Sequence, residues 1–190
     1  MNLLVLGPQG AGKGTQAKRI SAEYGIPHVS TGDMFRAAIA AGTELGKRIE
    51  PLYNAGALIP DEVTIAMIQD RLGEPDAAEG FVLDGFPRNL AQADALDEML
   101  SGIGRDLDGI LYFDVPDDVG IARALDRAKI ECRTDDTPEA IGRRLEIYHR
   151  ETEPVIEHYR ATGKLVPIHA ARSIEAVGAE ISDSLKVFAA

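Results

Sequence analysis

The nine residues Gly7–Thr15, with the sequence GPQGAGKGT, decide the fold of this chain. They directly follow the apolar run Leu3–Leu6, whose length and glycine boundary are typical of a buried strand in a parallel sheet. The residues from Lys13 to Tyr24 have the spacing of a helix. A glycine-rich turn between a strand and a helix forms a phosphate cradle, because its N–H groups turn inward and the helix N-terminus adds partial positive charge. Lys13 supplies a full charge to the outer phosphates.

This cradle departs from the general P-loop at one position. The general pattern places Ser or Thr directly after the lysine, as a magnesium ligand. Here Gly14 occupies that position and the hydroxyl follows at Thr15, so direct ligation of a metal by the protein stays open. The alternative is a tight turn that only needs glycine. Four glycines and a lysine within eight residues, directly after a strand, argue against it.

Length and composition restrict the class of protein. A chain of 190 residues is one domain and is long enough to bury a core. Its single cysteine, Cys132, excludes an internal disulfide and a cysteine-rich zinc site. The N-terminus leads into a strand without a basic region, and no apolar run approaches a membrane span, so we expect a cytoplasmic protein that does not bind membranes. A net charge of −11 argues against a nucleic-acid partner.

Predicted strands and helices alternate along the whole chain. We expect helices between the strands, with Asp61 capping one of them and Pro154 kinking or breaking a long one from Thr137 to about Tyr159. This order indicates an α/β fold in three layers, with ligands at the carboxyl ends of the strands. The five expected strands of its parallel sheet are residues 3–6, 26–30, 80–84, 109–115 and 165–169.

Two charged residues lie at the end of the third predicted strand. Asp84 closes the third predicted strand, where P-loop proteins place an acidic group near magnesium, although a cap or turn residue is the alternative. Arg88 follows the turn Gly85–Pro87, which restricts the backbone in a way that suits aiming a charge. The alternative for Arg88 is an ordinary surface arginine.

Two arginine pairs lie on predicted helices. Arg123 and Arg127 are four residues apart and share one stripe, for which a solvated face is the favoured interpretation from the pair alone. Arg144 lies at the edge of an apolar stripe, whereas Arg143 points well away from it. We therefore expect Arg144 to reach a cleft and Arg143 to be exposed.

Four segments together resemble the signature of the adenylate kinase family: residues 7–15, 30–33 (STGD), 83–88 (LDGFPR) and 133–136 (RTDD). They occur in the family's order, the resemblance covers essentially the whole chain, and Gly14 belongs to the family's pattern. It implies a P-loop kinase core over residues 1–190 that contains an excursion for the nucleoside monophosphate, residues 30–59, and a short lid, residues 126–136. That lid is too short for the zinc-binding insertion of many bacterial relatives, so the resemblance implies no structural zinc.

The resemblance also implies a role for individual residues. Those implied to bind ATP are Gly10, Ala11, Gly12, Lys13, Gly14, Thr15, Arg127 and Arg172. Those implied to bind AMP are Thr31, Arg36, Ala57, Leu58, Ile59, Gly85, Phe86, Pro87, Arg88, Gln92, Arg133 and Arg144. Asp84 is implied to hold Mg²⁺ through water, and the residues implied to act on the transferred group are Lys13, Arg88, Arg123, Arg133 and Arg144.

The implied reaction is reversible, in-line transfer of a phosphoryl group from ATP to AMP by a monomer, which gives two ADP. The AMP phosphate is already an anion, so no general base is needed, and we interpret the scattered histidines as structural or surface residues. A UMP/CMP kinase of the same fold is one alternative, which Thr31 and Gln92 disfavour. A nucleotide-binding switch is the other, although it would not need arginines around a second anion site.

Overall fold

Five parallel strands form the middle layer of the protein, in the order β2-β3-β1-β4-β5. The computed structural model describes residues 1–186 and 188. The central strand β1 pairs with β3 on one side and with β4 on the other, and Val5 of β1 lies opposite Asp84 of β3. The strands are β1 (Asn2–Leu6), β2 (His28–Ser30), β3 (Phe81–Asp84), β4 (Gly109–Asp114) and β5 (Leu165–His169).

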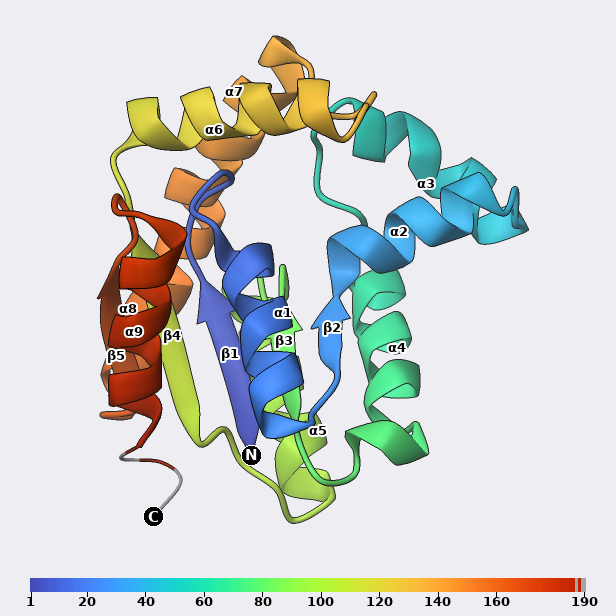
Figure 1. Ribbon diagram of the computed structural model, residues 1–190. Helices are drawn as coiled ribbons and strands as arrows, with labels where there is room; N and C mark the ends of the chain where they lie inside the picture. The colour runs from blue at the N-terminus through green and yellow to red at the C-terminus, as the bar shows by residue number, and fades with distance from the viewer. Residues whose placement is uncertain (187, 189–190) are drawn as a thin grey trace.

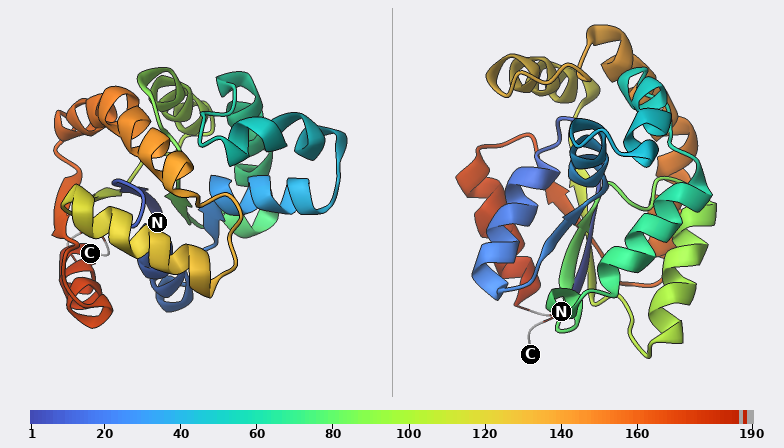
Figure 2. Two further views of the ribbon diagram at one scale, coloured as in Figure 1. Left: turned by 90° about the horizontal axis from the view of Figure 1, so that it is seen from above. Right: turned by 90° about the vertical axis from the view of Figure 1, so that its right-hand side faces the viewer.

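Helices cover both faces of this sheet (Figures 1 and 2). Leu3 and Val5 of β1 pack in one apolar cluster with residues of α1 and α9, while Leu4 and Leu6 pack in a second with residues of α4, α5 and α8. This division follows from the alternation of side chains along a strand. The helices on the two faces are α1 (Lys13–Tyr24), α9 (Ile174–Leu185), α4 (Asp61–Leu72), α5 (Leu90–Gly102) and α8 (Glu153–Arg160).

Two helical arms leave the layers near the carboxyl ends of the strands. The helices α2 (Thr31–Ala40) and α3 (Glu44–Asn54) project beyond β2 and share a small apolar cluster with Ile59 and with α4. The helices α6 (Asp117–Ile130) and α7 (Pro138–Ile147) cross above the strand ends (Figure 1). The arms and the P-loop therefore surround one end of the sheet.

The predicted fold class and all five strands are confirmed, with shifts of a few residues at strand ends. The predicted break near Pro154 is also present: α7 ends at Ile147, a π-helical turn spans Tyr148–Thr152, and Pro154 lies in the first turn of α8. A proline lacks an N–H and its ring crowds the carbonyl four residues earlier, so the ordinary helical pattern cannot run through the preceding turn. A short 3₁₀ helix, Pro75–Ala77, was not predicted.

The expected role of Asp61 as a helix cap is wrong. Pro60 occupies the N-cap position of α4 without a side-chain hydrogen bond, and Asp61 is the first helical residue. Its carboxylate accepts hydrogen bonds from Asn89 and Gln92 instead. The side chain therefore ties α4 to the start of α5.

Candidate active site

A cleft of about 760 Å³ opens between the P-loop, the turn after β3 and the two helical arms. Every site residue predicted from the sequence lines this cleft except Thr31 and Phe86. Phe86 is fully buried in the core behind the wall of the cleft. Thr31 is also buried, and its hydroxyl donates to the Gly85 carbonyl at 2.9 Å. These two residues support the wall rather than face the cavity.

Lys13 lies in a cradle made of backbone. Its ammonium group donates to the carbonyls of Gly7 and Pro8, both at 2.7 Å. Gly10 has a positive φ of 79° and lies so close to Gly120 that a Cβ would come within 2.0 Å of the Gly120 carbonyl oxygen, so only glycine fits there. Burial is the main cause that lowers the pKa of Lys13, to about 8, and it outweighs the nearby Asp84 carboxylate.

Two arginines resemble Lys13 in having only carbonyl partners. Arg88 donates from Nε to the Gly85 carbonyl at 2.8 Å, and burial followed by the charge of Arg144 lowers its pKa. Arg123 donates to the carbonyls of Ala170 at 2.8 Å and Arg172 at 3.1 Å. Within residues 1–186 and 188, none of Lys13, Arg88 and Arg123 forms an ion pair. Their charge is therefore left for an anion in the cleft.

Arg127 and Arg144 instead share a buried carboxylate in the loop between α6 and α7. Asp136, whose side chain is fully buried, accepts from Arg127 at 2.6 Å and from Arg144 at 2.7 Å. Arg144 also pairs with Asp135 at 3.0 Å. Gln9 of the P-loop donates to Asp136 at 2.7 Å, so this carboxylate joins the loop between α6 and α7 to the cradle. The solvated face considered for Arg127 is thereby wrong.

Asp84 lies beside Lys13 and is contacted by His28. The His28 Nε2 and Asp84 Oδ2 atoms are 3.4 Å apart. Burial raises the pKa of the Asp84 carboxyl, but the contact with His28 and the charge of Lys13 outweigh burial, so the net shift is downward. His28 was expected to be merely structural or on the surface; it lines the cleft because β2 lies next to β3.

Tyr53 of α3 is a cleft residue that sequence reasoning missed. Its hydroxyl accepts a hydrogen bond from Arg36 at 2.6 Å, and the Arg144 guanidinium lies 5.3 Å from its ring centre. Its carbonyl accepts from Arg144 at 3.1 Å. The only signal in the sequence was an aromatic residue at the end of a helix, which is far more often a core residue.

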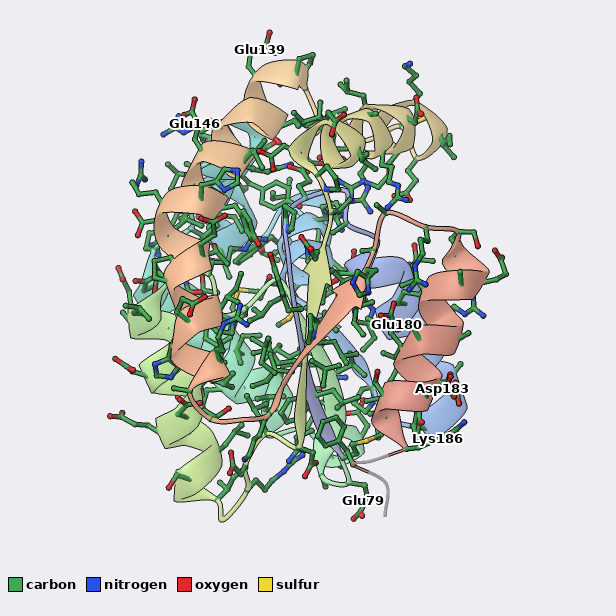
Figure 3. The ribbon with its side chains drawn as sticks, turned by 90° about the vertical axis from the view of Figure 1, so that its left-hand side faces the viewer. Glu79, Glu139, Glu146, Glu180, Asp183 and Lys186 are labelled. Carbon is green, nitrogen blue, oxygen red and sulfur yellow. The ribbon has the colours of Figure 1, made fainter. Side chains whose placement is uncertain are left out.

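Other arginines divide between the cleft and the surface. Arg144 is only 14% exposed whereas Arg143 is exposed, which confirms the prediction from the helix stripe. Arg133 lines the cleft and pairs with Glu131 at 2.6 Å. Arg172 borders the cleft, but its guanidinium pairs with Glu180 on α9, which is labelled in Figure 3. Its side chain therefore extends along α9.

Comparisons with known proteins agree with this geometry. The model of the family described as adenylate kinase matches residues 5–164. The chain belongs to the adenylate kinase family. An adenylate kinase of Stenotrophomonas maltophilia strain K279a is 45% identical over 186 residues, which cover 98% of this chain and 100% of the relative. One from Thermobifida fusca is 48% identical over 98% of each chain, and one from Streptomyces avermitilis is 44% identical over 98% of this chain and 97% of its own.

Membership confirms the expected enzyme class, a kinase. Adenylate kinases bind ATP, AMP and ADP and transfer a phosphoryl group reversibly from ATP to AMP, with magnesium bound to the nucleotide. In the described part of the chain, no group of three or more His, Cys, Asp or Glu residues could hold a metal ion. No described helix is both long and apolar enough to cross a membrane.

Proposed function

We propose that this chain transfers the terminal phosphoryl group of ATP to AMP in the cleft, with Lys13, Arg88 and Arg123 as the principal phosphate-binding cations. One observation carries the assignment: these three cations converge on the cleft with carbonyl partners only. A partly buried positive charge without an ion-pair partner is costly, and a phosphate anion removes that cost. Lys13 and the P-loop bind ATP, and Arg88, at the end of β3, binds the phosphate of AMP.

Lys13 on the ATP side and Arg88 on the AMP side face each other across the position of the transferred phosphoryl group. Negative charge spreads over the phosphoryl oxygens in the transition state, so fixed positive groups around it lower the barrier. Arg127, Arg133 and Arg144 supply further positive charge from the lid side, where their carboxylate partners hold them beside the cleft. Closing the cleft keeps water from competing with AMP as the phosphoryl acceptor.

The residues around Asp84 fit a nucleotide-bound magnesium ion. Mg²⁺ keeps several water ligands and takes one or two carboxylates together with substrate phosphates. Asp84 offers one such carboxylate beside Lys13, and its lowered pKa keeps it ionised. Asp84 would therefore hold Mg²⁺ through water, and the bound ion would neutralise charge on the phosphates. No zinc is needed, and purified protein should contain none.

The excursion and the lid are proposed as the two moving parts. Residues 30–59 hold α2 and α3, and residues 126–136 hold the end of α6 and the loop with Asp135 and Asp136. Phe35 of α2 packs with Ile49 and Tyr53 of α3, which supports movement of that arm as a unit. Val63 and Met67 of α4 also join this cluster, so the arm moves against α4. We also propose a cytoplasmic monomer without nucleic-acid or membrane partners, for which the net charge of −11 is the supporting property.

The decisive experiment measures kcat/KM for AMP, GMP, UMP and CMP with ATP fixed, in a coupled assay for ADP. AMP should be preferred, because Gln92 lines the cleft and its amide combines a donor with an acceptor, as adenine does. Gln92→Leu should erode the preference roughly ten- to a hundredfold. Comparable values for UMP and AMP in the unmodified protein would exclude the adenylate assignment and favour a UMP/CMP kinase.

A second measurement tests the phosphate-binding cations. Arg88→Ala should lower turnover by about a hundredfold or more, since it removes charge from the transition state. Arg143→Ala is the matched control: Arg143 is exposed and outside the cleft, so its loss should leave turnover unchanged. Binding of ATP without any ADP formation in the unmodified protein would support the switch alternative.

A further inference from the structure

The side-chain amide of Gln92 is held at both ends by groups that tolerate only one orientation. Oε1 accepts from the Arg88 backbone N–H at 2.8 Å, and Nε2 donates to Oδ1 of Asp61 at 2.7 Å. Gln92 is 1% exposed, yet it lines the cleft. An amide oxygen can accept two hydrogen bonds and an NH₂ group can donate two, so one acceptor and one donor remain for a ligand.

Asp61 is itself held in place. Asn89 donates from Nδ2 to both carboxylate oxygens, at 3.0 and 3.1 Å, and its own Oδ1 caps α5 by accepting from the Gln92 N–H at 2.9 Å. A half-turn of the Gln92 amide would point its oxygen at the Asp61 carboxylate and its NH₂ at the Arg88 N–H. Both contacts would be repulsive, so the amide has a fixed direction.

We propose that Asp61 is a positioning residue that sets the base selectivity of the acceptor site by fixing the direction of the Gln92 amide. The inference rests on the proposed function, in which the base of the monophosphate meets Gln92. Adenine presents an N–H donor next to a ring-nitrogen acceptor, and cytosine has the same order. Guanine and uracil present a carbonyl acceptor next to a ring N–H, which is the reverse order. The fixed amide matches the first pair and opposes the second.

Asp61→Asn tests this role because an asparagine amide can donate as well as accept. In the variant the introduced amide can donate to a turned Gln92 oxygen, so the Arg88 N–H is the one remaining contact that opposes the turn. We expect kcat/KM for GMP and for UMP, each relative to AMP, to rise about tenfold, while the ratio of CMP to AMP stays unchanged. Asp61→Ser, which keeps a polar residue at the start of α4 and can also donate or accept, should show the same pattern.

Asp70→Asn is the matched control, since Asp70 is exposed near the other end of α4 and lies outside the cleft. A merely structural role of Asp61 would change all four substrates by one factor, and that outcome overturns the proposal. Gln92→Leu in the same panel separates the two levels of inference. If Gln92→Leu leaves the AMP preference intact, the acceptor-site assignment fails. If it abolishes the preference and both Asp61 variants leave every ratio unchanged, only the positioning role fails.

Discussion

The cradle around Lys13 and the cluster around Asp136 line the same cleft, but their cations have different partners: backbone carbonyls in the cradle and a carboxylate in the cluster. Lys13 has only carbonyl partners, and burial lowers its pKa to about 8. Arg127 and Arg144 pair with the buried Asp136, at 2.6 and 2.7 Å. Lys13 therefore has no ion-pair partner until a phosphate binds, although the Asp84 carboxylate lies nearby, whereas the lid cluster is paired without one. We expect the cradle to favour function at the expense of stability, and the lid cluster to support both.

The largest effect is expected from removing the cradle's charge. Lys13→Met should lower kcat by about a thousandfold, because the positive group no longer meets the transferred phosphate. The free energy of unfolding at pH 7 should not fall, since a desolvated ammonium group is replaced by an apolar side chain. Coupled ADP assays and urea unfolding measure the two quantities. Lys47→Met, on the exposed face of α3, is the control. A clear loss of stability in Lys13→Met would contradict the contrast between the two regions.

The corresponding change in the lid should lower activity and stability together. Asp136→Ala leaves Arg127 and Arg144 without their shared buried partner, and breaking a buried pair from one side costs about 3–5 kcal/mol. Urea unfolding is the measurement. Asp183→Ala removes an exposed pair with Lys186 and should change stability by less than about 1 kcal/mol. Equal effects of the two substitutions would show that the buried cluster does not stabilise the fold.

The pH dependence of activity should differ between the free enzyme and the enzyme with phosphate bound in the cradle. Above about pH 8 the free enzyme loses the Lys13 proton, so kcat/KM for ATP should fall, by about tenfold at pH 9. Bound phosphate raises the pKa of Lys13, so kcat at saturating substrates should stay level over the same range.

The pKa shift of Lys13 affects the free energy of unfolding in the opposite direction to its effect on kcat/KM. Unfolded lysine keeps its proton up to its usual pKa of 10.5, so stability from this group rises between about pH 8 and 10.5. Parallel falls of kcat and kcat/KM would contradict this account.

The smallest expected effect lies in the backbone of the lid. Cys132 has a φ of 51°, in the left-handed region that favours glycine. Cys132→Gly should stabilise the protein by about 0.5–1 kcal/mol, after the greater freedom of glycine in the unfolded chain is allowed for. Cys132→Ser, which keeps the Cβ, should leave the melting temperature unchanged. If both variants melt at the same temperature, the left-handed backbone carries no measurable strain.

The sequence by itself determined the α/β fold, the approximate positions of its five strands and the phosphate cradle. These features depend on local properties: apolar runs of strand length, glycines in a turn, and a lysine at the start of a helix. The same local reasoning separated Arg144 from Arg143, because the two neighbours differ in direction on one helix. Family resemblance added the residues around the cleft, nearly all of which line it.

Only the tertiary structure decided how these charges are partnered. A hydrogen bond joins Gln9 to Asp136, which are 127 residues apart in the sequence. Others join Arg144 to Tyr53, 91 residues apart, and Gln92 to Asp61, 31 residues apart. Asp61 illustrates the reason. A local pattern predicts a helix cap, but the carboxylate binds α5 because the packing of α4 against α5 brings Asn89 and Gln92 within hydrogen-bond distance. Which partner a charged side chain takes depends on the distances that packing creates, and these do not follow from spacing along the chain.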